Sequence, residues 1–268
     1  MTSATSVSAP YYSPTLKLEK TWLKVARADQ HLDHLRQRIS LIEADVFSIA
    51  EERDPRNDDR VWRMVPGAKA SNLLDVSMYG VIVGDVIHQL RSALDHAVWK
   101  LAKPPVDFET AFPICLHELG KKGSFQSVSG KRLRNVDHSA VAYIESVQPY
   151  KRFGVKDPLW ALNELWNWDK HRQLIVVADP QWTQPLMIAF PDPKLDFAPG
   201  EQKEPDSLAN EILRLDAKSD AQATLAQPAP VRIVFKEPTV VSGKPVLAQL
   251  EWIKRCVQSV LVGLEAFL

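Results

Sequence analysis

The sequence predicts a mainly α protein, an antiparallel four- to five-helix bundle with a small antiparallel β-sheet inserted before the C-terminal helix. Apolar residues recur at intervals of three and four along several long segments, as they do on amphipathic helices. Short β-branched runs separated by Pro, Gly and Asp gather between residues 173 and 238, which is typical of strands. The composition, 45% hydrophobic and 25% charged, is that of a globular chain.

Charge and cysteine usage limit the kinds of partner and compartment. The 33 basic and 33 acidic residues cancel, so no extended DNA-binding surface is expected. Cys115 and Cys256 lie far apart and form no CxxC pair, which suits a reducing cytoplasm. No window approaches the roughly 18 apolar residues of a membrane span, and the first residues do not resemble a secretion signal. We therefore expect a cytoplasmic protein with no membrane partner.

The first long segment, residues 16 to 52, is predicted to be one amphipathic helix. Its apolar stripe is interrupted by Asp29 and consists of Leu18, Trp22, Val25, Leu32, Leu35, Ile39, Ile42 and Val46. Pro55 and the Asn and Asp residues beside it favour a turn after this helix. The run VWRMVPG, residues 61 to 67, is expected to form one short strand.

Three further helices are predicted before the β-rich part. The second runs from about residue 71 to 103 and ends before two prolines. A looped region follows, with TAFPI (110–114) as an extended piece and a Gly-, Ser- and Lys-rich stretch at 120–132. The third helix lies within 136–150 with Asp137 as its cap. The fourth lies within 157–172, with Asp157 as its cap and Pro158 as its first residue.

The remaining chain is predicted to be strands followed by a last helix. Strands are expected in QLIVVAD (173–179), PLMIAFPD (185–192), NEILRLDA (210–217) and VRIVFKEP (231–238), with a loop at 193–208. The helix at 244–268 is apolar on one side. The domains expected are a disordered lead-in (1–14), a helical bundle with a polar network (15–178), a small β insertion (179–244) and a C-terminal helix packing back on the bundle (245–268).

The second helix divides into an apolar half and an unusual polar half. At 100° per residue, the polar half carries Asp85, His88, Arg91, Ser92, Asp95, His96 and Trp99. Solvated helix faces favour Lys, Glu and Gln, so this choice of residues suggests a buried or cleft-lining network facing the fourth helix. On that fourth helix Asn163, Glu164, Asn167 and His171 share a face with Trp160, while Asp169 and Arg172 point the other way.

Three blocks in this order carry a resemblance: GDVIHQLRSALDHAVWKLA (84–102), FPI (112–114) and ELWNWDKHRQL (164–174). Over about residues 75 to 178 the chain resembles a set of uncharacterised bacterial proteins that share these blocks. This resemblance implies no activity.

The stretch RSALDH is also similar to the Arg-x4-His motif of the HEPN superfamily, helical bundles that include many metal-independent RNases. Arg91 and His96 take the two motif positions and Ser92 the polar position. The resemblance implies RNA as a partner, and a homodimer. In such an RNase a histidine moves the proton of a ribose 2′-hydroxyl while an arginine stabilises charge on the phosphate. The candidate catalytic residues are Arg91, His96, Asp95 and His88, supported by Asp85, Ser92, Asn163, Asn167, Asp169 and His171.

Two alternatives stay open. In a scaffold or interaction module, the polar network would only fix how the helices pack. In a metal-dependent hydrolase, imidazole and carboxylate ligands would come from His88, His96 and His171 with Asp85, Asp95 or Glu164, joined by His31 or His34. The chain has no HExxH, GxSxG, Walker A or GxGxxG motif, so we assign no metal ligand and no cofactor.

Overall fold

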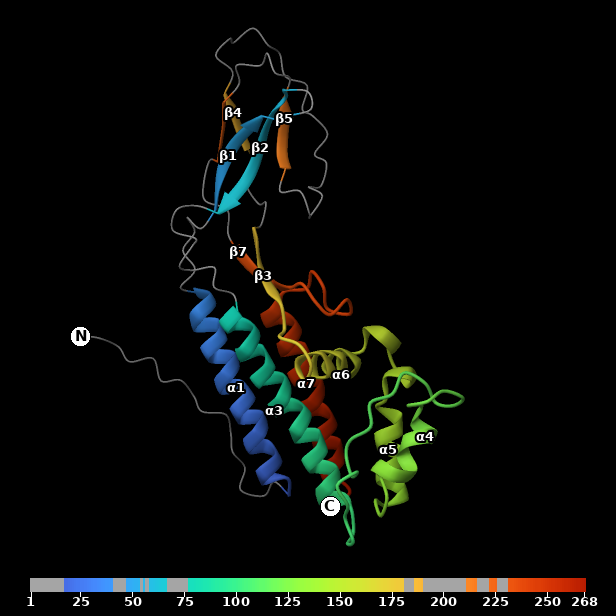
Figure 1. Cartoon of the computed structure of the whole chain (residues 1–268). Coiled ribbons are helices and arrows are strands. Elements are labelled where there is room, and N and C mark those ends of the chain that lie inside the picture. Colours follow the sequence, from blue (N-terminus) through green and yellow to red (C-terminus); the bar gives the residue numbers. More distant parts are fainter. Residues whose placement is uncertain are drawn as a thin grey trace, which may run out of the picture. The chain divides into compact units, whose positions relative to one another are not determined.

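The computed structural model describes residues 17–40, 47–53, 55, 58–66, 77–180, 186–189, 211–215, 222–225 and 231–268. In this part of the chain the fold is mainly helical, with short antiparallel strands before the C-terminal helix (Figure 1). The predicted fold class is confirmed. Within these ranges no helix combines the length and the apolar character that crossing a bilayer requires.

The described residues form six α-helices and seven strands. The helices are α1 Glu19–Ser40, α3 Ser77–Leu101, α4 Phe125–Arg132, α5 His138–Ser146, α6 Pro158–Asp169 and α7 Val246–Glu265. The strands are β1 Phe47–Arg53, β2 Arg60–Pro66, β3 Val176–Pro180, β4 Leu186–Ala189, β5 Glu211–Leu215, β6 Gln222–Leu225 and β7 Val231–Phe235. They pair as β1-β2-β5, β3-β7 and β4-β6, and each of these pairings is antiparallel.

The chain forms two compact units, each built from separate stretches. The described residues of unit 1 come from 17–30, 85–167 and 250–268, and those of unit 2 come from 31–84 and 168–249. The long helices α1, α3 and α7 each contribute one part to each unit. The domain boundaries expected at residues 178 and 244 stay a prediction.

In unit 1, α1 and α7 run antiparallel and are joined at two levels. Trp22 Nε1 donates to Glu265 Oε1 at 2.9 Å, and Lys254 Nζ donates to Asp29 Oδ1 at 2.7 Å. Trp22, near the start of α1, pairs near the end of α7, and the later Asp29 pairs with an earlier residue of α7. The two helices therefore run in opposite directions. Asp29, which interrupts the apolar stripe of α1, therefore serves as the acceptor for a lysine of α7.

The apolar arc predicted for the second helix is buried in α3. Every member of the arc has a relative exposure of 9% or less: Ile82, Val83, Val86, Leu90, Ala93, Leu94, Ala97 and Leu101. The helix ends at Leu101, just before the two prolines that were expected to close it. Its predicted residues 71–76 lie outside the described residues.

The helix predicted for residues 16–52 is wrong in its second part. It ends within the described residues at Ser40, and Phe47–Arg53 is strand β1. This strand pairs with all of β2, from Phe47 opposite Pro66 to Arg53 opposite Arg60. Ladder pairing with the predicted strand at 61–67 overrides the helical spacing of the segment, because β-structure depends on partners distant from the local pattern. The stripe residues Ile42 and Val46 lie outside the described residues.

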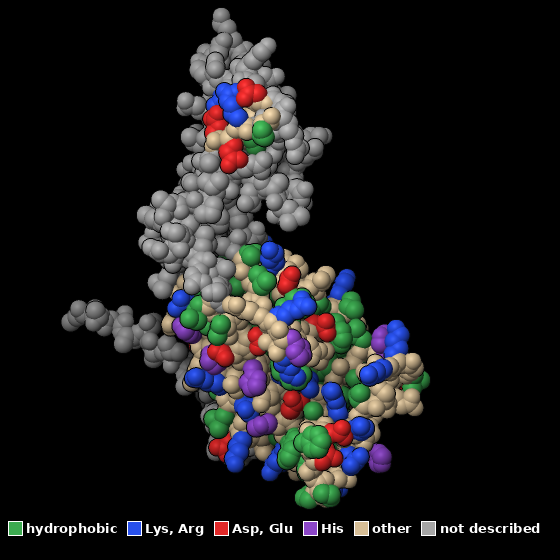
Figure 2. Space-filling view, in the orientation of Figure 1, with side chains coloured by type: hydrophobic (Ala, Val, Ile, Leu, Met, Phe, Trp, Pro, Cys, Tyr) green, Lys and Arg blue, Asp and Glu red, His purple; other side chains and the backbone are tan. Residues whose placement is uncertain are grey.

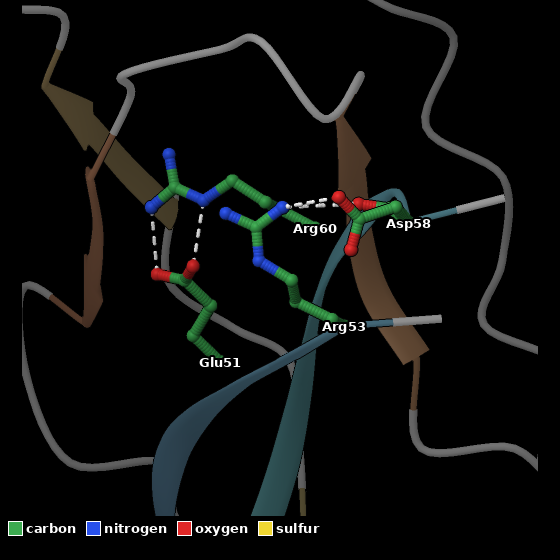
Figure 3. A network of polar contacts seen from close by, with 4 residues as sticks. All are labelled: Glu51, Arg53, Asp58 and Arg60. Atoms are coloured by element: carbon green, nitrogen blue, oxygen red, sulfur yellow. Dashed lines mark hydrogen bonds and ion pairs between the residues drawn. The ribbon is translucent and has the colours of Figure 1, made fainter. Parts of the chain in front are cut away.

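Ion pairs close the β1-β2 hairpin near its turn (Figure 3). Arg60 binds Glu51 with two hydrogen bonds, Nε to Oε1 at 2.6 Å and Nη2 to Oε2 at 2.7 Å. Arg53 Nη1 donates to Asp58 Oδ2 at 3.0 Å. The hydrogen bonds from Arg60 hold the pKa of Glu51 below its usual value. One pair therefore links β1 to β2 and the other links β1 to the turn between them, and both support the register that the ladder sets.

Two of the shorter helices begin where their caps predict. Asp137 Oδ1 accepts from Ser139 N at 3.4 Å at the start of α5, and Asp157 Oδ1 accepts from Leu159 N at 2.8 Å at the start of α6. The stretch 120–132, expected to be a loop, contains the helix α4. Its Gly and Ser content disfavours a helix, but burial of Phe125 and Leu133 anchors the segment. Strand β6 was also not expected.

In unit 2, two glycines allow close approach of α3 to the chain around residues 169–174. A Cβ on Gly80 would lie 2.3 Å from the backbone oxygen of Leu174. A Cβ on Gly84 would lie 2.7 Å from Asp169 Oδ1. Only glycine leaves room for these neighbours, and the first of them is backbone that cannot rotate away.

We predict that Gly80→Ala destabilises the protein by about 2 kcal/mol because the added methyl group overpacks against a carbonyl. Urea unfolding followed by circular dichroism measures this change. Gly130→Ala in α4 is the matched control, since no atom lies within 4 Å of its Cβ position; we expect it to be neutral or to stabilise by up to about 1 kcal/mol. Equal stabilities of the two variants would contradict the close approach.

Candidate functional site: the Arg91 pocket

Arg91 and Asp95 of α3 together hold the backbone of Phe112. Spaced four residues apart on a helix, they lie on one face, and Arg91 Nη2 donates to Asp95 Oδ1 at 2.9 Å. The same Nη2 donates to the carbonyl oxygen of Phe112 at 2.6 Å, and Asp95 Oδ1 accepts from the Phe112 N–H at 2.9 Å. The backbone C=O and N–H of Phe112 are thus both hydrogen-bonded to the Arg91–Asp95 ion pair.

Further side chains fix the segment on either side of Phe112. Trp99, one turn beyond Asp95, donates from Nε1 to the carbonyl oxygen of Thr110 at 2.9 Å. The buried Gln148 donates to the carbonyl oxygen of Pro113 and accepts from the N–H of Cys115, both at 2.9 Å. Residues 110–115 form no strand, and these hydrogen bonds replace those that a sheet would supply.

The guanidinium of Arg91 is buried and only partly paired. Arg91 as a whole is 2% exposed. Its Cζ lies 5.1 Å from the ring centroid of Trp166 on α6, a distance at which cation–π interactions occur. Among the described residues Nε and Nη1 have no hydrogen-bond partner. Burial lowers the pKa of Arg91, Asp95 raises it, and the neighbouring cation Arg132 lowers it. A buried cation with two unused donors is a place where an anion would be stabilised.

Arg91 and Asp95 line a pocket of about 730 Å³ within unit 1. Helix α6 contributes Trp160, Asn163, Trp166 and Asn167 to its lining. The loop before α4 and α4 itself contribute His117, Lys122, Lys131 and Arg132. Basic residues of the lining outnumber the acidic ones, which are Asp95 and Glu109. Lys131 Nζ is 3.5 Å from Glu109 Oε1, so part of this positive charge is already paired.

The basic residues on and before α4 were missed by the sequence prediction. Lys122, Lys131 and Arg132 belong to the stretch whose Gly, Ser and Lys content was interpreted as a loop. The signal that could have found them is the cationic run Lys131, Arg132 and Arg134 next to two glycine-flanked lysines. On the face drawn in Figure 2, the described Lys and Arg side chains are interspersed with Asp and Glu.

The predicted site residues divide into two groups. Arg91, Asp95, Asn163 and Asn167 line the pocket together. The others are not among its described lining residues: Asp85, His88, Ser92, His96, Asp169 and His171. Of these, Asp85, His88, His96 and His171 are exposed. The polar half of α3 is therefore not buried as a whole, in contrast to the expectation that it faces inward.

His96 lies apart from the pocket that Arg91 lines. Five residues of ideal helix turn the two side chains about 140° from each other. Burial lowers the pKa of His96, Lys24 of α1 lowers it further and Asp95 raises it, and His96 is not among the described lining residues of the pocket. The histidine that does line the pocket is His117.

No metal centre is formed by the side chains that the structure describes. Among them, no group of three or more His, Cys, Asp or Glu residues is close enough to hold an ion. The ligand set of the metal alternative, His88, His96 and His171 with a carboxylate, is therefore not brought together. Cys115 lines the pocket, but burial raises its pKa to about 11, so its thiol is not an activated nucleophile.

Comparison with protein-family models, with curated proteins and with solved structures finds no match to this chain. Both resemblances drawn from its motifs stay predictions.

We predict that Asp95→Ala destabilises the protein by about 2 kcal/mol, since it leaves the buried Arg91 without its counter-ion and the Phe112 N–H without its acceptor. Chemical denaturation measures the change. Asp95→Asn, which keeps an acceptor oxygen but no charge, should fall between wild type and Asp95→Ala. The control is Asp33→Ala, which removes an exposed ion pair with Arg36 in α1 and should cost less than about 0.5 kcal/mol. A neutral Asp95→Ala would show that Asp95 does not support the clamp.

Proposed function

We propose that this protein binds single-stranded RNA, with a phosphate group held in the Arg91 pocket. The observation that carries the proposal is the buried Arg91 guanidinium, which has two N–H donors without a partner among the described residues. Arginine presents its donors in a planar fork that matches phosphate oxygens. Arg132 and Lys122 in the same lining add positive charge to the place where the phosphate would lie.

The pocket favours a single strand over a duplex. A pocket lined by Trp160 and Trp166 can admit an unstacked base and one phosphate, but not a base-paired helix. The zero net charge supplies no general attraction to duplex DNA. Tryptophan rings beside arginines are the combination that proteins use to hold single strands, because every base has a flat face that can stack.

The proposal is for binding and does not require cleavage. The RNase activity that the HEPN resemblance implies needs a group that moves a proton beside the bound phosphate. His96, the motif histidine, is not a described lining residue of the pocket. Products formed during binding experiments, compared between wild type and His96→Ala, would reveal whether cleavage accompanies binding.

A second candidate function, a non-enzymatic interaction module, is favoured by the clamp on Phe112. Arg91 and Asp95 form hydrogen bonds with each other and with the backbone of Phe112, as residues that only fix packing would do. RNA binding and the interaction module can be told apart by the cations of α4. These cations take no part in the clamp on Phe112, and only RNA binding requires them.

We expect Arg132→Ala to weaken binding of a fluorescein-labelled 10-nucleotide RNA of mixed sequence by about tenfold, the value of one charge-assisted contact. Fluorescence anisotropy over a salt series measures this. The slope of log affinity against log salt should fall by about 0.7, because one phosphate contact is lost.

Arg134→Ala is the matched control, since this nearby arginine pairs with Asp107 at 3.4 Å and is not a described lining residue. It should change the affinity less than twofold. Equal affinities of Arg132→Ala and wild type, or no binding at low salt, would reject RNA binding at this pocket and favour the interaction module.

A further inference from the structure

The Arg91 pocket has a second chemical character besides its positive charge. Trp160, Asn163 and Asn167 lie on one face of α6, at intervals of three and four residues, and all three line the pocket with Trp166. Indole rings stack on planar groups, and a carboxamide presents donors and an acceptor in one plane. This face of α6 suits a flat heteroaromatic ring with polar edges.

An exposed aromatic residue extends this character to the rim. Phe108 lines the pocket although its side chain is 92% exposed. It belongs to the segment between α3 and α4, as do Ile114 and Leu116, which also line the pocket. Leaving a phenyl ring in water costs free energy that contact with an apolar ligand surface would recover. A phosphate ion alone would gain nothing from Phe108.

The pocket has the size of a small-molecule site. About 730 Å³ lies within the range of pockets that enclose a drug-sized ligand, so a base, a sugar and a phosphate fit into it together. Its lining offers one group of cations and one aromatic face, which match one phosphate and one base.

The arginines and the tryptophans of the pocket lining lie next to each other. The Cζ of Arg91 lies over the Trp166 ring of α6, 5.1 Å from its centroid, and Arg132 of α4 lines the same pocket as both residues. A phosphate near these two arginines would place the attached sugar and base within reach of the α6 residues. Glu109 and Asp95, the acidic lining residues, are already engaged by Lys131 and Arg91.

We infer that the Arg91 pocket takes one phosphorylated nucleotide, with the phosphate on Arg91 and Arg132 and the base against Trp160 and the amides of Asn163 and Asn167. This inference rests on the proposed function and specifies its ligand. The same chemistry is offered by a free nucleoside monophosphate and by the phosphorylated end of an RNA strand, and the experiment below separates these two sources.

The experiment measures binding of the full chain to adenosine monophosphate, uridine monophosphate, ribose 5-phosphate and inorganic phosphate by isothermal titration calorimetry. Both nucleotides should bind roughly tenfold or more tightly than ribose 5-phosphate, because stacking of a base on an aromatic side chain is worth that much. Trp160→Leu should remove most of this difference and leave the affinity for ribose 5-phosphate within twofold. Trp252→Leu is the matched control; Trp252 is in α7, is not a described lining residue of the pocket, and should change neither value.

A second arm compares 10-nucleotide RNAs that carry a 5′-phosphate, a 3′-phosphate or hydroxyls at both ends. Tighter binding of one phosphorylated RNA identifies a strand end as the source, while tight mononucleotide binding without any RNA preference identifies a free nucleotide. Equal affinities for nucleotide and ribose 5-phosphate would overturn the inference, as would RNA binding that ignores both terminal phosphates and is not inhibited by mononucleotides. In that last case binding of RNA by Arg132 would still stand, so the two proposals fail separately.

Discussion

A guanidinium group that is buried away from water needs partners inside the protein. The segments around Arg91 supply them, and the rest of the site depends on these contacts. Its neighbours come from all three blocks that the sequence presents in order. Asp95 lies in the same helix, the carbonyl of Phe112 belongs to the FPI block, and Trp166 belongs to α6. If Arg91 were shorter or uncharged, the segment 110–115 would lose one anchor and Trp166 would lose the cation above its ring.

In the function proposed above, the same side chain would serve structure and binding because its donors are divided. Nη2 is used twice inside the protein, on Asp95 and on Phe112, while Nε and Nη1 have no partner among the residues described. Such a division holds the guanidinium plane in a fixed orientation before any ligand arrives. Preorganised donors lose less entropy on binding than a lysine on a flexible stem would.

The sequence predicted the helical part well because its signals are local. The apolar arc of α3, the caps Asp137 and Asp157, and the prolines after α3 act within a few residues of the structure they specify. Strand β1 was missed because its partner β2 lies beyond a turn, and helix α4 because its anchor, the burial of Phe125, depends on tertiary packing. The candidate site was half predictable for the same reason: the Arg91–Asp95 spacing is helical, whereas the approach of α4 and its Arg132 is not.

The antiparallel pairing of α1 with α7 has a consequence for how the chain is made. Asp29 meets Lys254 across 225 residues of sequence, and Trp22 meets Glu265 across 243. At a ribosomal rate of about 5 to 20 residues per second, roughly 10 to 50 seconds pass between synthesis of the α1 residues and synthesis of their α7 partners. Closure of unit 1 by α7 is therefore a late event in synthesis, made through contacts of long sequence separation. During that interval the α1 surface that later meets α7 is open to holding chaperones, and to the same surface on another nascent chain.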